Sequence, residues 1–285
     1  MGAILLALLI VLAIQAWPSI TKFGGSFFTN SVWDPVKEVF GALPAVFGTL
    51  ASSFLALVLA VPISLGTAIF LAELAPKWLR GPGSFIIEML AAIPSVVIGL
   101  WGIFVMIPAI RPVEVWMNGH LGSLPFFKGN PYLGFNMLAA ALILAIMIIP
   151  IITAVSRDAI RAVPLAQKES MLALGATRWE TLSRVVLPYC RSSLIGAIIL
   201  GLGRALGETM AVTMVIGNAD NISWSLLSSG TTIASKIASQ FGEASGLMLG
   251  SLIELALILL AVSLVVNVVA RLLVWRLTAV KVGRV

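Results

Sequence analysis

Two ionisable residues four positions apart, Arg204 and Glu208, interrupt an otherwise apolar stretch and are followed by Thr209. A charge within the hydrocarbon of a membrane costs at least about 2.5–3.5 kcal/mol on insertion scales, so Arg204 requires a partner or a wet cavity. Four residues along a helix place Glu208 on the same face, within reach of an ion pair. Held in this way, the guanidinium is suited to bidentate binding of an oxyanion such as phosphate. The alternative is a self-neutralising pair that only packs a helix bundle.

A polar stretch, residues 157–191, is the longest and most basic interruption between the apolar segments. Residues 163–174 are helix formers with an apolar face, and Gly175 suits the left-handed turn that ends a helix. Thr177 precedes Glu180 by three residues, which is the capping-box spacing that starts a second helix. We predict two short helices at an angle, outside the bilayer, that another protein can bind. The alternative is an ordinary basic connection between two membrane spans.

Apolar segments make up most of the chain and must position these residues. Hydrophobic residues account for 60% of the 285 residues and charged residues for 11%, which excludes a soluble protein. Stretches of roughly 20 apolar residues are long enough to cross about 30 Å of hydrocarbon, and only as helices. We therefore predict an all-α integral membrane protein with six transmembrane helices. The predicted spans are about 2–17, 45–71, 85–107, 135–155, 193–216 and 247–270.

Basic residues give the orientation. Most of the 18 Lys and Arg residues lie at 77–80, in 157–191 and near the C-terminus, and the other loops hold few. By the positive-inside rule these segments and both termini are cytoplasmic, on the side where ATP is found. The membrane therefore explains the net charge of +6, and no nucleic-acid partner is expected.

Three further acidic residues lie in or near the predicted spans. Glu73 and Glu88 are close to the cytoplasmic ends of the second and third spans, where Lys77 and Arg80 can neutralise them. Glu254 is deeper in the sixth span, and both a helix neighbour and the transport pathway are open to it.

Catalytic and cofactor motifs are missing from the sequence. It contains no G-x-x-x-x-G-K-[ST] and no G-x-G-x-x-G after a strand. With His120 as the one histidine and Cys190 as the one cysteine, a Ser-His-Asp triad, a disulfide and a metal-ligand cluster are all excluded or disfavoured. We expect no catalytic residue, no metal and no cofactor in this chain.

The polar loop resembles a known transporter motif. Glu169-Ser170-Met171, then Gly175, then Leu187-Pro188 is similar to the "EAA…G…LP" loop of permease subunits of binding-protein-dependent bacterial ABC importers, the MetI-like family. Ser170 and Met171 replace the two alanines of that pattern. In the family, the first short helix of the loop docks on an ATPase subunit. The resemblance implies that Glu169, Ser170, Met171, Leu172, Ala173, Leu174 and Gly175 couple this chain to an ATPase.

Other segments narrow the resemblance to phosphate permeases of the PstC type. Residues 70–76, 91–102 and 203–212 carry it, and it covers most of 40–275. It implies the type I ABC importer permease fold, with a first span and external loop at 1–43, a permease core at 44–275 containing the coupling loop at about 157–191, and a basic cytoplasmic tail at 276–285.

The same resemblance implies a function and a set of partners. The chain is expected to be the permease subunit that moves inorganic phosphate into the cell by alternating access, with Arg204, Glu208 and Thr209 in the substrate pathway. The implied partners are a second, PstA-like permease, two PstB-like ATPase subunits that bind ATP and Mg²⁺, a periplasmic or extracellular PstS-like phosphate-binding protein and membrane lipid. The implied location is the bacterial cytoplasmic (inner) membrane.

Three alternatives stay open at this point. The same fold can carry another oxyanion, such as sulfate or molybdate. A secondary transporter or channel without an ATPase should show an inverted repeat, and no convincing repeat relates residues 44–156 to 193–275. A membrane scaffold without transport leaves Arg204 unexplained.

Overall fold

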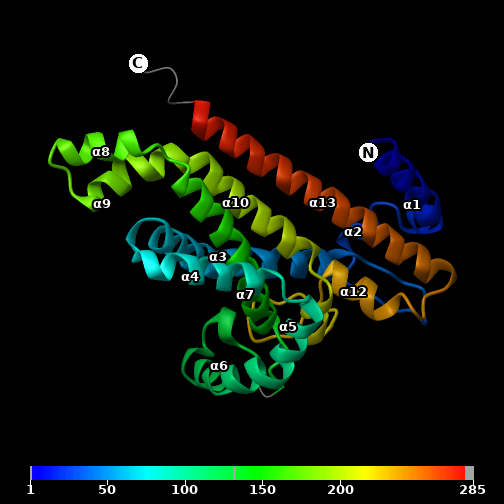
Figure 1. Ribbon diagram of the computed structural model, residues 1–285. Helices are drawn as coiled ribbons and strands as arrows, with labels where there is room; N and C mark the ends of the chain where they lie inside the picture. Colours follow the sequence, from blue (N-terminus) through cyan, green and yellow to red (C-terminus); the bar gives the residue numbers. More distant parts are fainter. Residues whose placement is uncertain (1, 131–132, 280–285) are drawn as a thin grey trace. The chain divides into compact units, whose positions relative to one another are not determined.

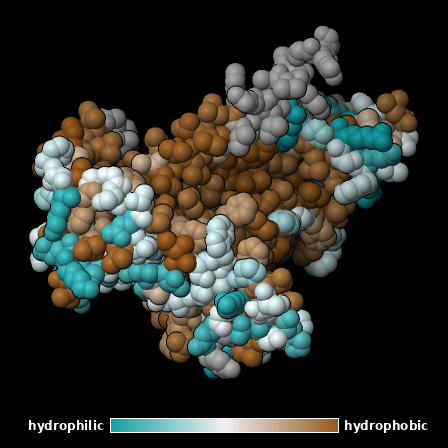
Figure 2. Space-filling view, turned by 180° about the vertical axis from the view of Figure 1, so that it is seen from behind, coloured by the Kyte–Doolittle hydropathy of each residue, from teal (hydrophilic) through white to brown (hydrophobic). Residues whose placement is uncertain are grey.

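The computed structural model describes residues 2–130 and 133–279, and within these residues it is all-α, with no β-strand. Six helical stretches are long and apolar enough to cross a membrane, which confirms the predicted fold class. They are Leu6–Phe23, Leu43–Leu74, Ser95–Leu121, Met137–Arg161, Arg178–Gly207 and Gly246–Leu272. Figure 2 shows hydrophobic residues gathered over a large area of one face, as expected of surfaces that face lipid.

The described residues form two compact units, and the helices α3 (Leu43–Ile69), α7 (Met137–Arg161), α10 (Leu187–Gly207) and α13 (Gly246–Ala279) each belong partly to one unit and partly to the other. Unit 1 comprises residues 1–56, 94–144 and 206–265, and unit 2 comprises 57–93, 145–205 and 266–285. Figure 1 labels the elements of both units. In chain order they are α1 (Gly2–Phe23), α2 (Ser26–Thr29), α3 (Leu43–Ile69), η1 (Phe70–Leu74), α4 (Lys77–Ala91), α5 (Ser95–Trp101), η2 (Gly102–Met106), α6 (Ile107–Leu121), η3 (Pro125–Phe127), α7 (Met137–Arg161), α8 (Leu165–Ala173), α9 (Arg178–Thr181), η4 (Leu182–Val186), α10 (Leu187–Gly207), α11 (Met210–Val215), α12 (Ile233–Gln240) and α13 (Gly246–Ala279).

Unit 1 has a core in which aromatic side chains from the segment after α1 pack on α12 and α13. Phe27, Trp33 and Phe40 are buried there with Ile233 and Leu252. Two polar contacts lock the start of α12 in place: Thr49 Oγ1 accepts a hydrogen bond from Ile233 N–H at 2.9 Å, and Thr232 forms a capping box with Ser235. Both contacts occupy donors that a helix N-terminus leaves free, so α12 is fixed although it has only eight residues.

In unit 2, residues 57–69 of α3 pack against α7 and α10. Its core includes Ala68 from α3, Ile160 from α7 and Leu194 from α10. Ser64 Oγ donates to Ile149 O at 3.3 Å, and Thr153 Oγ1 donates to Ser64 O at 3.4 Å. Hydroxyl groups of this kind join membrane helices because no water competes for the backbone carbonyls.

The first span continues to Phe23, beyond the predicted end at residue 17, and the third and fifth spans differ more from the sequence prediction. The third span begins at Ser95 and continues to Leu121, whereas residues 77–91 form the separate helix α4. Pro94 causes the separation, because proline lacks an N–H and suits the position just before a helix; it is the N-cap of α5. The predicted span 193–216 is also interrupted, since α10 ends at Gly207 and α11 begins at Met210. Part of the predicted tail, residues 276–279, is still helical in α13, and 280–285 lie outside the described residues.

Candidate functional site

The segment predicted to couple the chain to an ATPase forms the helix α8 and the turn after it, in unit 2. In Figure 1, α8 and α9 form a helical hairpin that follows α7. The turn after α8 is closed by two backbone hydrogen bonds, from Gly175 N–H to Leu172 O and from Ala176 N–H to Met171 O. Gly175 has φ +86°, a left-handed conformation that glycine adopts at little cost, so the predicted helix end is confirmed.

The start of α9 is also as predicted, but the helix is not a short separate one. Thr177 Oγ1 accepts from Glu180 N–H at 3.2 Å and Glu180 Oε2 accepts from Thr177 N–H at 2.9 Å, which completes the capping box. From Arg178 the helical chain continues through η4 into α10 without a break. The hairpin is therefore joined to α10 by one helical path.

Ion pairs fix α8 and the end of α7 within unit 2. Lys168 Nζ is 2.5 Å from Glu73 Oε1, which lies in η1 at the end of α3. Arg157, only 6% exposed in its side chain, pairs with Glu88 Oε1 at 3.1 Å. The prediction that Lys77 and Arg80 neutralise these two glutamates was therefore wrong.

Arg80 instead donates hydrogen bonds to backbone carbonyls. Its Nε donates to Ala75 O at 2.8 Å and its Nη2 donates to Glu73 O at 3.4 Å. These are carbonyls at the end of η1, which have no helical partner and carry a partial negative charge. Arg80 thus secures the turn that presents the Glu73 carboxylate to Lys168.

A cavity of about 480 Å³ opens beside α8. Glu73, Lys168 and Glu169 contribute its polar lining, and Leu172, Trp179 and Leu182 contribute apolar lining. Around it, large apolar side chains are open to solvent: Leu165 is 70% exposed, Leu174 83% and Trp179 69%. Apolar residues rimmed by charges, on a projection outside the predicted spans, form a surface suited to another protein. We call it the α8 surface.

Arg204 and Glu208, which were predicted to lie within the membrane, have unlike surroundings. Arg204 is exposed in α10, whereas Glu208 is 9% exposed and lies one residue past the helix end. Glu208 Oε1 accepts from Ala211 N–H at 3.3 Å, one of the free donors at the start of α11. The predicted ion pair between Arg204 and Glu208 is not among the ion pairs of the described residues, because Glu208 leaves the helical path at Gly207.

Thr209 lies in the same break. Its Oγ1 donates to Gly207 O at 3.3 Å, and its carbonyl accepts from Thr213 Oγ1 at 2.6 Å. A helix interrupted inside an apolar segment leaves backbone donors and acceptors available, and membrane transporters place substrates at such breaks.

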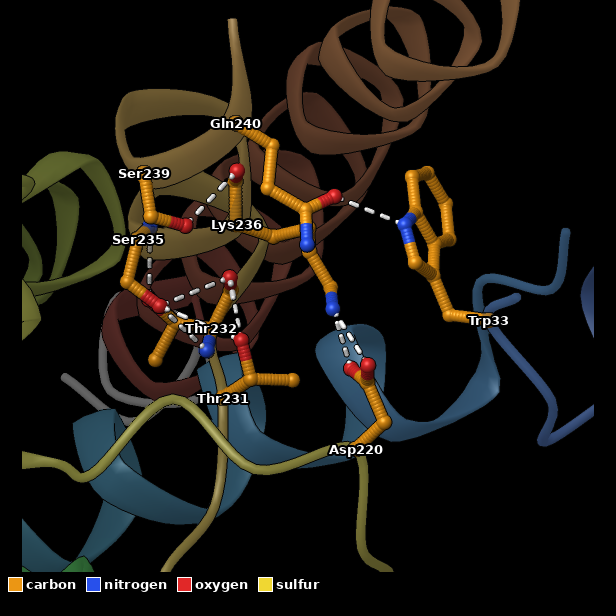
Figure 3. Close-up of polar contacts among 8 residues, drawn as sticks. All are labelled: Trp33, Asp220, Thr231, Thr232, Ser235, Lys236, Ser239 and Gln240. Carbon is orange, nitrogen blue, oxygen red and sulfur yellow. Dashed lines mark hydrogen bonds and ion pairs between the residues drawn. The ribbon is translucent and has the colours of Figure 1, made fainter. Parts of the chain in front are cut away.

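A buried polar cluster in unit 1 was not predicted from the sequence (Figure 3). Lys236 Nζ is 2.5 Å from Asp220 Oδ1 and 5.0 Å from the centre of the Trp33 ring, and the lysine side chain is only 3% exposed. Trp33 Nε1 donates to Gln240 Oε1 at 2.7 Å. Burial lowers the pKa of Lys236, although Asp220 opposes this shift. The available signal was a single lysine inside the short, otherwise uncharged segment 233–240.

Glu254 is 5% exposed within unit 1. It lies one turn after Ser251, whose Oγ is 2.9 Å from Ser19 Oγ in α1. Of the two roles left open for Glu254, this placement favours contact with a neighbouring helix.

The single histidine and the single cysteine of the chain have ordinary surroundings. His120 is exposed, and its ring stacks on Trp116 with centroids 4.8 Å apart. Cys190 is buried in the core of unit 2. Within residues 2–130 and 133–279, no three His, Cys, Asp or Glu side chains come together as a metal site.

Comparison with protein families gives one match over most of the chain. The family model described as "Binding-protein-dependent transport system inner membrane component" matches residues 60–279. A "Phosphate transport system permease protein PstC" of Haemophilus influenzae is 48% identical over 283 residues, covering 98% of this chain and 90% of the relative. The protein of that name from Pasteurella multocida is 50% identical, covering 96% and 87%. A "Phosphate transport system permease protein PstC 2" of Mycobacterium tuberculosis is 42% identical, covering 94% and 85%.

Solved structures share the fold at low sequence identity. A chain of the MetNI methionine ABC transporter in inward-facing conformations superposes with a TM-score of 0.62 at 16% identity, covering 86% of this chain and 99% of that chain. A chain of a bacterial ABC transporter for the acidic polysaccharide alginate gives 0.65 at 17% identity, covering 97% and 95%.

Proposed function

We infer that this chain, which belongs to the family of binding-protein-dependent transport system inner membrane components, is the permease subunit of an ATP-driven importer for inorganic phosphate. The observation that carries the substrate is the identity of 42–50%, over nearly the whole chain, to relatives named as phosphate permeases. The observation that carries the use of ATP is the α8 surface, with its exposed leucines and Trp179 beside charged residues. The chain itself hydrolyses no ATP in this proposal.

The α8 surface is the docking site for an ATPase subunit. Glu169 and Ser170 are exposed on α8, and Leu172 and Leu174 offer apolar area at its end. Two connections transmit a displacement of α8 into the membrane: the ion pair of Lys168 with Glu73, at the end of α3, and the continuous helix from Arg178 into α10. ATP binding and hydrolysis shift the equilibrium between two packings of the spans, because the ATPase holds α8 differently in its two states.

Arg204, Glu208 and Thr209 belong to the substrate pathway. The guanidinium of Arg204 is exposed and has no carboxylate partner among the described residues, so it is available to phosphate. Glu208 stabilises the break after Gly207 by accepting the Ala211 N–H. The break gives the pathway its exposed backbone groups.

The same family membership supports a proposed assembly, and the distribution of basic residues supports a proposed orientation. We propose a second, PstA-like permease, two PstB-like ATPase subunits and a PstS-like phosphate-binding protein outside the cell membrane as partners. Both termini and the α8 surface face the cytoplasm, because the basic residues of the chain gather in those segments.

Reversing the charge of Glu169 tests the coupling. Wild type and Glu169→Lys are solubilised in detergent and purified, and the co-purified ATPase subunit is quantified. We expect a severalfold loss of ATPase, since a new positive charge enters the centre of the docking surface. The matched control is Glu243→Lys, an exposed glutamate in the loop between α12 and α13. Absence of any ATPase in wild type would favour the channel or secondary transporter.

Uptake assays test the substrate and its residue. Arg204→Ala should abolish or strongly reduce phosphate uptake in cells, while sulfate and molybdate uptake stay at background in wild type and variant. Arg184→Ala, which removes an exposed arginine at the start of the same helical stretch, is the control. Unchanged phosphate uptake in Arg204→Ala would remove this residue from the pathway.

A further inference from the structure

A second cavity in unit 2, of about 320 Å³, is an apolar groove with one arginine. It is formed between α3, α7 and α10, and its aliphatic lining includes Leu65 and Ile69 from α3, Ile160 from α7, and Leu194 and Ile198 from α10. Arg191 also lines it. None of these residues takes part in the α8 surface or in the predicted substrate pathway. The volume lies at the lower end of the range for ligand sites.

Arg191 distinguishes this groove from a simple gap between apolar side chains. The lining is almost wholly apolar, so Arg191 contributes its methylene stem to the groove and extends its guanidinium beyond it. Among the described residues, no carboxylate forms an ion pair with Arg191, and none lines the groove. The site therefore offers a positive charge that the protein itself leaves uncompensated.

The depth of Arg191 in the membrane fits a phosphate group. Arg191 is the last charged residue before the uncharged stretch 192–203, and because a charge is costly within the hydrocarbon, we place Arg191 in the headgroup layer. Leu194 and Ile198 follow one and two turns deeper, so the groove leads from the headgroup layer into the acyl layer.

We propose that this groove binds one anionic phospholipid, with its phosphate on the Arg191 guanidinium and an acyl chain along the aliphatic lining. An anionic lipid is favoured because the groove has no carboxylate to receive the cationic group of a zwitterionic headgroup. Free phosphate does not fit, since the lining beyond Arg191 is aliphatic. The leaflet that supplies the lipid is the cytoplasmic one if the proposed orientation holds, but the groove and its ligand class do not depend on the transported substrate.

Native mass spectrometry of the purified protein, with whatever subunits remain bound to it, measures this directly. Phosphatidylglycerol and phosphatidylcholine are titrated separately, and lipid adducts on this chain are counted. We expect one phosphatidylglycerol to bind more tightly than phosphatidylcholine, and Arg191→Ala to weaken it roughly fivefold, the effect of one basic residue at an anionic headgroup. Arg191→Lys should retain most of the affinity, and Arg184→Ala should leave it unchanged.

A groove-filling variant and a cross-link separate the possible occupants. Ile195→Trp, at another lining position, should lower the affinity for phosphatidylglycerol, measured relative to the control Arg184→Ala. A photo-reactive amino acid at Ile198 should give adducts with lipid. Adducts with a second permease subunit, equal binding of the two lipids, or an unchanged affinity in Arg191→Ala would each overturn the proposal. Because the readout is lipid mass on this chain, it is independent of phosphate uptake and of ATPase binding.

Discussion

Each unit contains a lysine–carboxylate ion pair that holds a short helix outside the predicted membrane spans, but the two pairs have unlike surroundings. In unit 2, Lys168 pairs with Glu73 and holds α8, and the lysine side chain is 14% exposed. In unit 1, Lys236 pairs with Asp220 and holds α12, with the lysine only 3% exposed. The first pair borders a cavity and exposed leucines, whereas the second is covered by the Trp33 ring.

The difference distinguishes a surface that is open to a partner from a contact that is buried within one unit. Around Lys236 the polar atoms find partners within unit 1, and the aromatic core of Trp33 and Phe40 lies beside it. Around Lys168 the lining is left open, so a protein that docks there changes the environment of the pair. We infer that the Lys236 pair is structural and that the Lys168 pair is the movable contact between α8 and the end of α3.

Removing Asp220 should have the largest effect, because it leaves a buried charge without its partner. We expect Asp220→Ala to destabilise α12 by about 3 kcal/mol or more. Hydrogen–deuterium exchange of the α12 amides measures the loss. The control is Glu38→Gln, which breaks the solvent-exposed pair with Lys22 and should cost less than about 0.5 kcal/mol. Equal protection in the two variants would show that the Lys236 pair does not hold α12.

Exchanging the charges of the other pair should have a smaller effect on stability and a clear one on coupling. Lys168→Glu and Glu73→Lys each bring like charges together, and we expect each to loosen α8 by about 1–2 kcal/mol and to reduce the co-purified ATPase. The double variant should recover most of both. The control is Lys77→Glu, an exposed lysine outside any ion pair of the described residues. A double variant that behaves like the two losses added together would exclude the pair as the link.

Local features of both units could be predicted from the sequence, and long-range ones could not. The six spans, the end of α8 at Gly175 and the capping box of Thr177 depend on apolar length or on residues within one turn. The partners of Glu73 and Glu88 are more than sixty residues away in the chain, in α8 and α7, so nearby Lys77 and Arg80 looked sufficient.

The third span shows a different limit. Pro94 was recognised as a break, but the apolar residues continue on both sides of it, so composition did not show which side crosses the membrane. In the structure, the helical stretch long and apolar enough to cross a membrane is on the C-terminal side, Ser95–Leu121. Charged residues on α4 such as Arg80 and Glu88 are a signal that this helix has a polar environment. The same difficulty hid the break at Gly207, because glycine is common in membrane helices and its neighbours there are mostly apolar.

The pH dependence of unit 1 should provide the smallest effect and the most specific one. Burial lowers the pKa of Lys236 below the ordinary lysine value of 10.5, so between the lowered pKa and 10.5 the unfolded chain binds more protons than the folded one. Stability therefore rises with pH across that window, by at most about 1.4 kcal/mol per pH unit, and below it the full cost of burying the charge remains. Thermal unfolding of the purified protein, measured from about pH 8 upward, should show this rise.

Lys236→Met should remove the rise, since methionine fills similar space without a charge. Its stability near neutral pH should fall less than that of Asp220→Ala, because the Asp220 carboxylate left behind is 26% exposed and stays partly hydrated. Lys37→Met, at a lysine whose side chain is 78% exposed in the same unit, should retain the rise. If Lys236→Met instead unfolds like Asp220→Ala, the ion pair itself stabilises unit 1, and the attraction of Asp220 outweighs the cost of burial. The contrast with the Lys168 pair would then be one of access alone, because both pairs would stabilise the helix that they hold.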